Sequence, residues 1–273
     1  LGEDRALPAR GPAGPLAQAR PMPVALSPNA AGALWMLVSV AGATGMTVMV
    51  RALSDELSSP MLAFLRSVAA LLFLAPLLLR RAEGARRGLT RPGLHLARGA
   101  LVALALNLGF YALSAIPVAT ATILFFLAPV FSTALAPLMV GERVGPRRKA
   151  AVAVGFAGAL VVIRPGFGEI EPAMLSAAAS SLCFATALLL GKKASAADGS
   201  DAVFVTTALI AAVLTLPPAL FAWGWPVDGA AWLGVLALAG ASSLRAYADI
   251  RAFAAGEASF VAPVSYLRLP SVA

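Results

Sequence analysis

The sequence predicts an all-α, polytopic membrane helical bundle of about nine spans. Hydrophobic residues make up 60% of the 273 residues and charged residues 12%, whereas soluble domains hold about 45–50% and 25%. The charged residues also gather in short stretches between long uncharged runs, which is typical of chains that cross a bilayer repeatedly. These observations exclude a soluble globule, and the abundance of apolar residues excludes a disordered or collagen-like chain.

Each uncharged run predicts a span, because the bilayer core needs roughly 20 helical residues and a buried charge in it is costly. The predicted spans cover residues 31–50, 61–79, 97–114, 117–139, 150–163, 172–191 and 202–227, with an eighth from about 231 and a ninth from about 258. The third and fourth spans share one uncharged run of 43 residues. Pro117 divides that run, since proline tends to begin a helix rather than continue one.

The later spans need more than run length to define them. Lys149 and Arg164 flank the short fifth run, and their long side chains can snorkel to the two interfaces. Trp223 and Trp225 mark the end of the seventh run, where an aromatic belt is expected. Charges in the second half of the eighth run would end it at Leu244 by hydropathy alone, and the C-terminus cuts off the ninth.

Basic residues are distributed unequally between the two sides of the predicted membrane. Fifteen of the 21 Lys and Arg residues lie in residues 1–30, 80–98, 143–149 and 192–193, which all fall on one side. The opposite loops hold only Arg51 and Arg164. The positive-inside rule therefore predicts a multi-pass protein of the cell (inner) membrane with a cytoplasmic N-terminus. This placement makes the lipid bilayer, and not nucleic acid, the expected partner of the basic residues.

Residues 1–30 are rich in Pro, Gly and Arg and contain no apolar run. They predict a disordered cytoplasmic leader and not a secretory signal peptide. The chain begins with Leu1, and Met22 lies just before the first predicted span, so we expect either a fragment or a misassigned start.

A shift of 141 residues relates the two halves of the chain. It pairs Ser39 with Ser180, Pro76 with Pro217, Gly99 with Gly240 and Pro129 with Pro270. Each copy would hold five spans, and an odd number inserts the second copy upside down, as in the inverted repeats of many secondary transporters. The same shift places a tenth helix beyond residue 273, so we expect the ninth helix to be truncated in this chain.

Seven segments carry a resemblance to a known family: residues 64–66, 110–113, 119–129, 141–142, 161–165, 251–253 and 258–270. Together they resemble the drug/metabolite transporter superfamily and, within it, the EamA-like family. The resemblance implies ten helices in two inverted five-helix repeats, here residues 31–164 and a truncated second repeat at residues 172–273. It also implies that helices three, four, eight and nine line a central cavity.

Ionisable side chains within the spans are the first candidates for a binding site, because charged groups at membrane depth usually face a cavity or a partner. Arg245 and Asp249 lie four residues apart and can pair, either as a structural ion pair or as part of a solute site. Arg268 lies deeper in the ninth span and lacks an evident counter-charge, so an anionic solute could complete its site. Arg66 lies within snorkelling reach of the interface, which favours a structural role.

Polar and aromatic residues of the predicted cavity helices form a second group of candidates for solute binding. They are Asn107, Tyr111, Thr122, Phe126 and Tyr266, and the alternative for each is ordinary packing. Pro129 and Pro270 fall within helices, where proline bends the axis and frees a carbonyl, so they are candidates for a gate. Glu142 is expected to be a solvated loop carboxylate beside a basic cluster, with a gate contact as the alternative.

The sequence shows no catalytic constellation, metal cluster or GxxxxGK[ST] nucleotide loop, since His95 lies in a predicted basic loop and Cys183 is the only cysteine. We therefore expect neither an enzyme nor a cofactor or metal. The predicted function is secondary transport of a small organic solute by alternating access, with a homodimer left open. The alternative is a non-transporting membrane partner or sensor protein, or an inactive fragment of a transporter.

Overall fold

The computed structural model describes residues 27–82, 89–163 and 171–271, and every regular element in those ranges is a helix. The elements are α1 (Pro28–Leu53), α2 (Ser59–Ala82), α3 (Pro92–Ala115), α4 (Val118–Phe125), α5 (Leu127–Val140), α6 (Pro146–Ile163), α7 (Pro172–Asp198), α8 (Ser200–Phe221), α9 (Gly229–Ala255), α10 (Ala258–Val261) and the 3₁₀ segment η1 (Ala262–Ser271). The predicted all-α class is therefore confirmed.

Each of the nine predicted spans overlaps a helix of the structure. Six stretches of the described chain are long and apolar enough to cross a membrane: α1, α3, α4 with α5, α7, α8 and α9. Large apolar side chains also cover the outside of the bundle, with Leu138 84% exposed and Phe221 93% exposed. A soluble protein does not expose such a surface, but lipid satisfies it. The chain is a multi-pass membrane protein.

Three spans differ in detail from the sequence prediction. The fourth is interrupted at Phe126 between α4 and α5. Pro129 explains this break, because it has no N–H for the carbonyl of Phe125, where α4 ends. The eighth does not end at Leu244 but continues as α9 to Ala255. The ninth is α-helical for only one turn and continues as η1.

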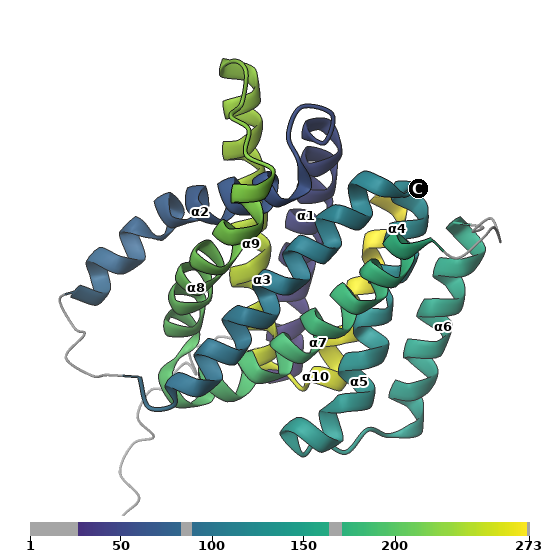
Figure 1. Cartoon of the computed structure of the whole chain (residues 1–273). Coiled ribbons are helices and arrows are strands. Elements are labelled where there is room, and N and C mark those ends of the chain that lie inside the picture. Colours follow the sequence, from purple (N-terminus) through teal and green to yellow (C-terminus); the bar gives the residue numbers. More distant parts are fainter. Residues whose placement is uncertain (1–26, 83–88, 164–170, 272–273) are drawn as a thin grey trace, which may run out of the picture.

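Helices α2 and α6 lie at opposite edges of the bundle (Figure 1). Helix α1 packs along α9, and α3 packs along α7. Gly42 permits the first contact, because a Cβ there would lie 2.8 Å from the Ala241 carbonyl oxygen of α9. Small residues are a common means of close helix approach in membranes, where van der Waals packing drives association.

The helix boundaries follow the 141-residue shift that relates the two halves of the sequence. The shift places α1 on α7, α2 on α8, α3 on α9, and α4 with α5 on α10 with η1. The contacts follow the same relation, since the pair α1 and α9 corresponds to the pair α7 and α3. Gly99 and Gly240, which the shift pairs, face Ile210 of α8 and Phe73 of α2 respectively. Both halves thus use a glycine where a neighbouring helix crosses.

Candidate functional site

A central cavity of about 150 Å³ is lined by residues of α1 to α5, α7, α9 and η1. Most of its wall is apolar, and the polar residues in it are Ser39, Arg66, Ser132, Ser180, Ser181, Arg245, Asp249 and Ser265. Ser39 and Ser180, which the 141-residue shift pairs, both line it. The cavity therefore lies where the two halves of the chain meet.

Asp249 is the acidic centre of the cavity and is 4% exposed. Its Oδ1 accepts a hydrogen bond of 2.5 Å from the Ser39 hydroxyl of α1. Its Oδ2 lies 3.7 Å from the Arg245 Nε, one helical turn earlier on α9. The i, i+4 spacing places the two side chains on one face of the helix, so Arg245 and Asp249 pair as a carboxylate and a guanidinium inside the bundle.

Arg245 is held by further contacts on the cavity wall. Its guanidinium lies 4.5 Å from the centroid of the Phe184 ring, and its Nη1 lies 3.6 Å from the Met46 sulfur. A guanidinium over an aromatic face is attracted by the ring quadrupole. These contacts orient Arg245 without removing its charge from the cavity.

Arg66 of α2 enters the same cavity from the other side of the bundle. It is only 8% exposed, and its Nε is buried with no hydrogen-bond partner among the described residues. Arg66 and Arg245 line the same cavity, so two positive charges face one enclosed space. The expectation that Arg66 snorkels to the interface is therefore wrong, because the rotation of α2 turns this side chain inward.

Arg98 of α3 is a buried arginine of a different kind. Its Nε donates a 3.0 Å hydrogen bond to the Thr207 hydroxyl, and its Nη1 donates to the Ala187 carbonyl. Gly191 makes room for it, because a Cβ there would lie 2.3 Å from Arg98 Nη1. From its sequence position Arg98 was predicted to lie among the loop charges. In the structure Arg98 is buried, and its hydrogen bonds connect α3 to α7 and α8.

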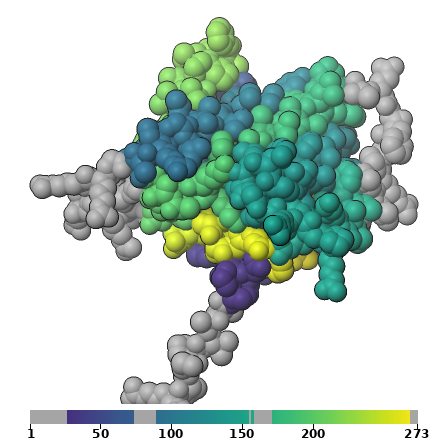
Figure 2. Space-filling model, turned by 90° about the horizontal axis from the view of Figure 1, so that it is seen from below, coloured from purple at the N-terminus to yellow at the C-terminus, as the bar shows by residue number. Residues whose placement is uncertain are grey.

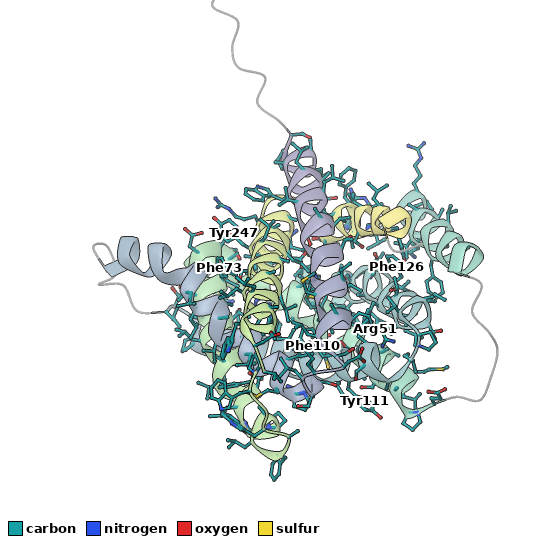
Figure 3. The ribbon with its side chains drawn as sticks, turned by 90° about the horizontal axis from the view of Figure 1, so that it is seen from above. Arg51, Phe73, Phe110, Tyr111, Phe126 and Tyr247 are labelled. Carbon is teal, nitrogen blue, oxygen red and sulfur yellow. The ribbon has the colours of Figure 1, made fainter. Side chains whose placement is uncertain are left out.

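Phenylalanine side chains form much of the apolar wall: Phe110, Phe125, Phe126, Phe184 and Phe253. Phe126 sits at the break between α4 and α5 and beside the C-terminal segment (Figure 3). The Tyr266 hydroxyl donates a 3.1 Å hydrogen bond to the Phe126 carbonyl, and the two ring centroids are 5.2 Å apart. Tyr266 thus holds the interrupted helix against η1.

The candidate residues predicted from the sequence divide into three groups. Arg245, Asp249, Phe126 and Pro129 line the cavity. Asn107, Tyr111, Thr122 and Tyr266 do not line it: Tyr111 is 47% exposed, Thr122 is fully buried, Tyr266 packs behind Phe126, and the Asn107 amide donates to the Ala103 carbonyl at 2.9 Å. The side chains of Arg268 and Pro270 lie outside the described residues, so their predicted roles stay predictions.

Glu142 forms a polar cluster at one end of the bundle. Its carboxylate accepts hydrogen bonds from the Lys192 ammonium at 2.7 Å and from the Ala258 and Ser259 amides at 2.9 and 3.1 Å. The Lys192 ammonium also donates to the Gly256 carbonyl at 2.6 Å. We call these five residues the Glu142 clasp. It joins the end of α5 to α7 and to the start of α10.

The clasp overturns the expectation of a solvated loop carboxylate, because the Glu142 side chain is only 12% exposed. Gly141 has a φ of 74° and turns the chain inward at this point. Partial burial acts to raise the pKa of Glu142, but the hydrogen bonds from Lys192, Ala258 and Ser259 outweigh it and hold the pKa below its ordinary value. The carboxylate is therefore ionised at neutral pH.

The same end of the bundle carries two further ties. Arg148 of α6 pairs with Glu257, beside the clasp, and donates to the Ser259 hydroxyl at 2.8 Å. The Asn29 side chain of α1 accepts from the Glu257 amide at 3.0 Å. Figure 2 views this face and shows the start of α1, in purple, against the yellow C-terminal segment. These contacts bring the starts of α1, α6 and α10 together.

His95 was predicted to lie in a basic loop, but it lies on α3 and is 1% exposed. Its Nε2 is 2.9 Å from Asp198 of α7, and its Nδ1 is 2.7 Å from the Thr206 hydroxyl of α8. The Thr90 amide donates to the second carboxylate oxygen of Asp198 at 2.8 Å. This group joins α3, α7 and α8, and no three His, Cys, Asp or Glu residues in the described ranges could hold a metal.

Sequence reasoning missed several cavity residues, above all Ser39, Ser180 and Phe184. The signal for the two serines was present, since the 141-residue shift pairs them. Phe184 lies in an uncharged run without a motif, so nothing local distinguished it.

Comparison with known proteins identifies the family. Residues 30–164 match the model of the EamA-like transporter family. The riboflavin transporter of Rhizobium johnstonii is 32% identical over 252 residues, which cover 90% of this chain and 83% of that protein. The chain belongs to the EamA-like transporter family. The S-adenosylmethionine uptake transporter of Rickettsia bellii is a further relative of this EamA-like chain, 28% identical over 246 residues that cover 90% of this chain and 84% of that protein.

A solved crystal structure shares the EamA-like fold. It aligns with a TM-score of 0.69 at 23% identity and covers 88% of this chain and 85% of that one. Family, relatives and fold agree, and the chain is a membrane transporter of a small solute.

Proposed function

We propose that this chain moves a small organic solute with a flat ring system across the inner membrane by alternating access. The observation that carries this proposal is the central cavity, whose wall includes five phenylalanines. Aromatic side chains attract flat rings through offset-stacked and edge-to-face contacts. The substrates named for the relatives, riboflavin and S-adenosylmethionine, both contain a fused aromatic ring, which supports the same chemistry here.

The two halves, residues 31–164 and 172–273, are the proposed moving units. Inverted repeats commonly place the solute site near the bilayer midplane and rock one half against the other. The central position of the cavity, with Ser39 and Ser180 in its wall, supports this mechanism.

Arg245, Asp249 and Phe126 are the proposed solute-binding residues among those predicted from the sequence. Tyr266 is proposed to position Phe126 through its hydrogen bond to the Phe126 carbonyl. Pro129 is proposed to supply the bend that lets α5 move separately from α4.

The Glu142 clasp is the proposed closed gate. It lies at the end of the bundle where the basic residues of 143–149 and 192–193 are found. The positive-inside rule assigns that end, and with it the N-terminus, to the cytoplasm. The opposite end is tied by simpler contacts, such as the 2.8 Å hydrogen bond between Ser59 and Ser114. The structure then represents a state closed toward the cytoplasm.

Uptake into proteoliposomes tests the proposal. Purified protein should accumulate radiolabelled riboflavin or S-adenosylmethionine, or another flat-ring solute found by competition, above protein-free vesicles. Phe184→Ala should lower the apparent affinity about tenfold, as expected if about 1.4 kcal/mol of ring contact is lost. Phe221→Ala is the matched control, because Phe221 is 93% exposed on the outside of α8. Equal effects of the two variants, or no uptake of any flat-ring solute, would contradict the proposal.

A further inference from the structure

The central cavity holds more positive than negative charge. Its ionisable lining residues in the described part of the chain are Arg66, Arg245 and Asp249, so two guanidinium groups face one carboxylate. An uncompensated charge in a low-dielectric membrane interior costs several kcal/mol. Among the described lining residues, positive charge therefore exceeds negative charge by one.

The excess charge is located at Arg66. Asp249 and Arg245 lie within one helical turn and compensate each other. The Arg66 Nε is buried without a hydrogen-bond partner among the described residues, and Arg66 shares the cavity with the positively charged Arg245. A buried donor that leaves its hydrogen bond unmade destabilises the protein. A ligand that brings an anionic acceptor would remove both penalties at once.

A small second cavity beside Arg66 limits the side from which an organic ligand can reach the Arg66 guanidinium. This cavity, of about 30 Å³, is lined by Arg66, Thr207 and Ser243, and the Ser243 hydroxyl has no partner among the described residues. Such a volume holds a water molecule but no organic solute. Of the two cavities that Arg66 lines, only the central one is large enough for an organic anion.

We propose that Arg66 binds a carboxylate of the transported solute, so that the preferred solute is a monoanion with a flat ring. This inference rests on the proposed function and adds the charge of the solute to it. The planar guanidinium suits a carboxylate, because two parallel N–H groups can donate to its two oxygens. The carboxylate faces Arg66 on α2 while the ring lies against Phe110, Phe125 and Phe184, which come from α3, α4 and α7.

Matched acid and amide probes test the site. We would measure binding to the purified protein by calorimetry for two pairs, benzoate with benzamide and indole-3-acetate with indole-3-acetamide. Each pair keeps the ring and changes only the charge. The wild type should bind the acids at least about tenfold more tightly than the amides, since a charge-assisted hydrogen bond is worth about 1.5–3 kcal/mol.

Variants of Arg66 locate the discrimination. Arg66→Gln should bring the acid-to-amide ratio to about one, and Arg66→Lys should keep part of it. Arg51→Gln is the matched control, because Arg51 lies on α1 and is exposed, and it should keep the full ratio. If Arg66→Gln does not fold, the acid-to-amide ratios of the wild type and of Arg66→Lys still test whether Arg66 binds the carboxylate.

Three results would overturn the inference: a wild-type ratio near one in both pairs, an unchanged ratio in Arg66→Gln, or equal thermal stabilisation by chloride and by the carboxylates. The result is separable from the proposed function. A protein that transports neutral riboflavin but prefers no carboxylate loses only the Arg66 site. A protein that prefers carboxylates but transports no solute loses only the transport mechanism.

Discussion

The Glu142 clasp and the charged residues of the central cavity use the same chemical groups in opposite ways. In the clasp one carboxylate receives an ammonium and two amides, and its hydrogen bonds measure 2.7–3.1 Å. In the cavity Asp249 accepts a 2.5 Å hydrogen bond from Ser39 and lies 3.7 Å from Arg245, whereas the Arg66 Nε has no hydrogen-bond partner among the described residues. The clasp is thus electrostatically complete, whereas the cavity is not.

This difference indicates a structural role for the clasp and a ligand-binding role for the cavity charges. A satisfied cluster fixes helices relative to each other, because each of its bonds must be broken before they separate. An unsatisfied buried charge destabilises the empty protein and becomes favourable only when a ligand supplies its partner. Substitutions of Glu142 and of Arg66 should therefore change stability with opposite signs.

The largest expected effect is at the clasp. Glu142→Ala removes the shared acceptor of the Lys192 ammonium and two amides, and it should lower the free energy of unfolding by about 3 kcal/mol, the lower end of the cost of removing one partner of a buried charge pair. Unfolding in mixed detergent micelles would measure this. Glu171→Ala is the control, because Glu171 is exposed and its side chain makes no capping bond to α7. An equal loss of stability in both variants would contradict the claim that the Glu142 clasp stabilises the folded protein.

Acid should reproduce most of that loss. The hydrogen bonds hold the pKa of Glu142 below its ordinary value, so their stabilisation is present above the unfolded pKa of about 4.3. It is lost as the pH falls through the lower, folded pKa. The stability difference between wild type and Glu142→Gln should therefore persist at pH 5 and disappear in stronger acid. A difference that already vanishes near pH 6 would contradict this assignment.

Arg66→Met should have the opposite sign. Replacing an uncompensated buried guanidinium by an apolar side chain of similar length should raise the stability of the empty protein by about 2 kcal/mol, while abolishing the preference for carboxylates. Arg98→Met is the matched control, because Arg98 is equally buried but bonded to Thr207 and Ala187. It should lose stability in the same unfolding assay. Destabilisation by both would mean that Arg66 has a structural partner.

The smallest expected effects come from the two serines that the 141-residue shift pairs. Ser39 donates to the Asp249 carboxylate and Ser180 to the Ala105 carbonyl, at 2.5 and 2.7 Å. Ser39→Ala should cost about 1.5 kcal/mol and Ser180→Ala about half of that, because a charged acceptor makes the stronger bond. Equal losses would show that Asp249 carries little charge in the empty cavity.

The positions of the helices along the chain could be predicted from the sequence, because hydropathy and proline act on neighbouring residues. Pro117 divides the long run between α3 and α4, as predicted, and the 141-residue shift matches the helix boundaries of the two halves. The spacing of Arg245 and Asp249 also defined their common helical face. Such features depend on neighbours in the chain, which the sequence shows directly.

The contacts of single side chains could not be predicted in this way. Arg66 turns inward because of the rotation of α2, and a change of one residue rotates a helix position by about 100°. The partners of His95 and Glu142 lie on other helices, with Asp198 and Ser259 more than 100 positions away. Hydropathy and charge counts contain no information about pairs at such separations.

The break at Phe126 makes α5 a separate helix that extends from the central cavity to the Glu142 clasp. Helix α5 has 14 residues and is therefore a rod about 21 Å long at 1.5 Å per residue. Near its start, Pro129 and Ser132 lie in the cavity wall. Just past its end, Glu142 forms the clasp. Because the rod is separated from α4, α5 connects the cavity wall to the Glu142 clasp as one element of its own. Tyr266, which donates to the Phe126 carbonyl, ties η1 to the start of this element, so the cavity wall, the clasp and the C-terminal segment are all linked through α5.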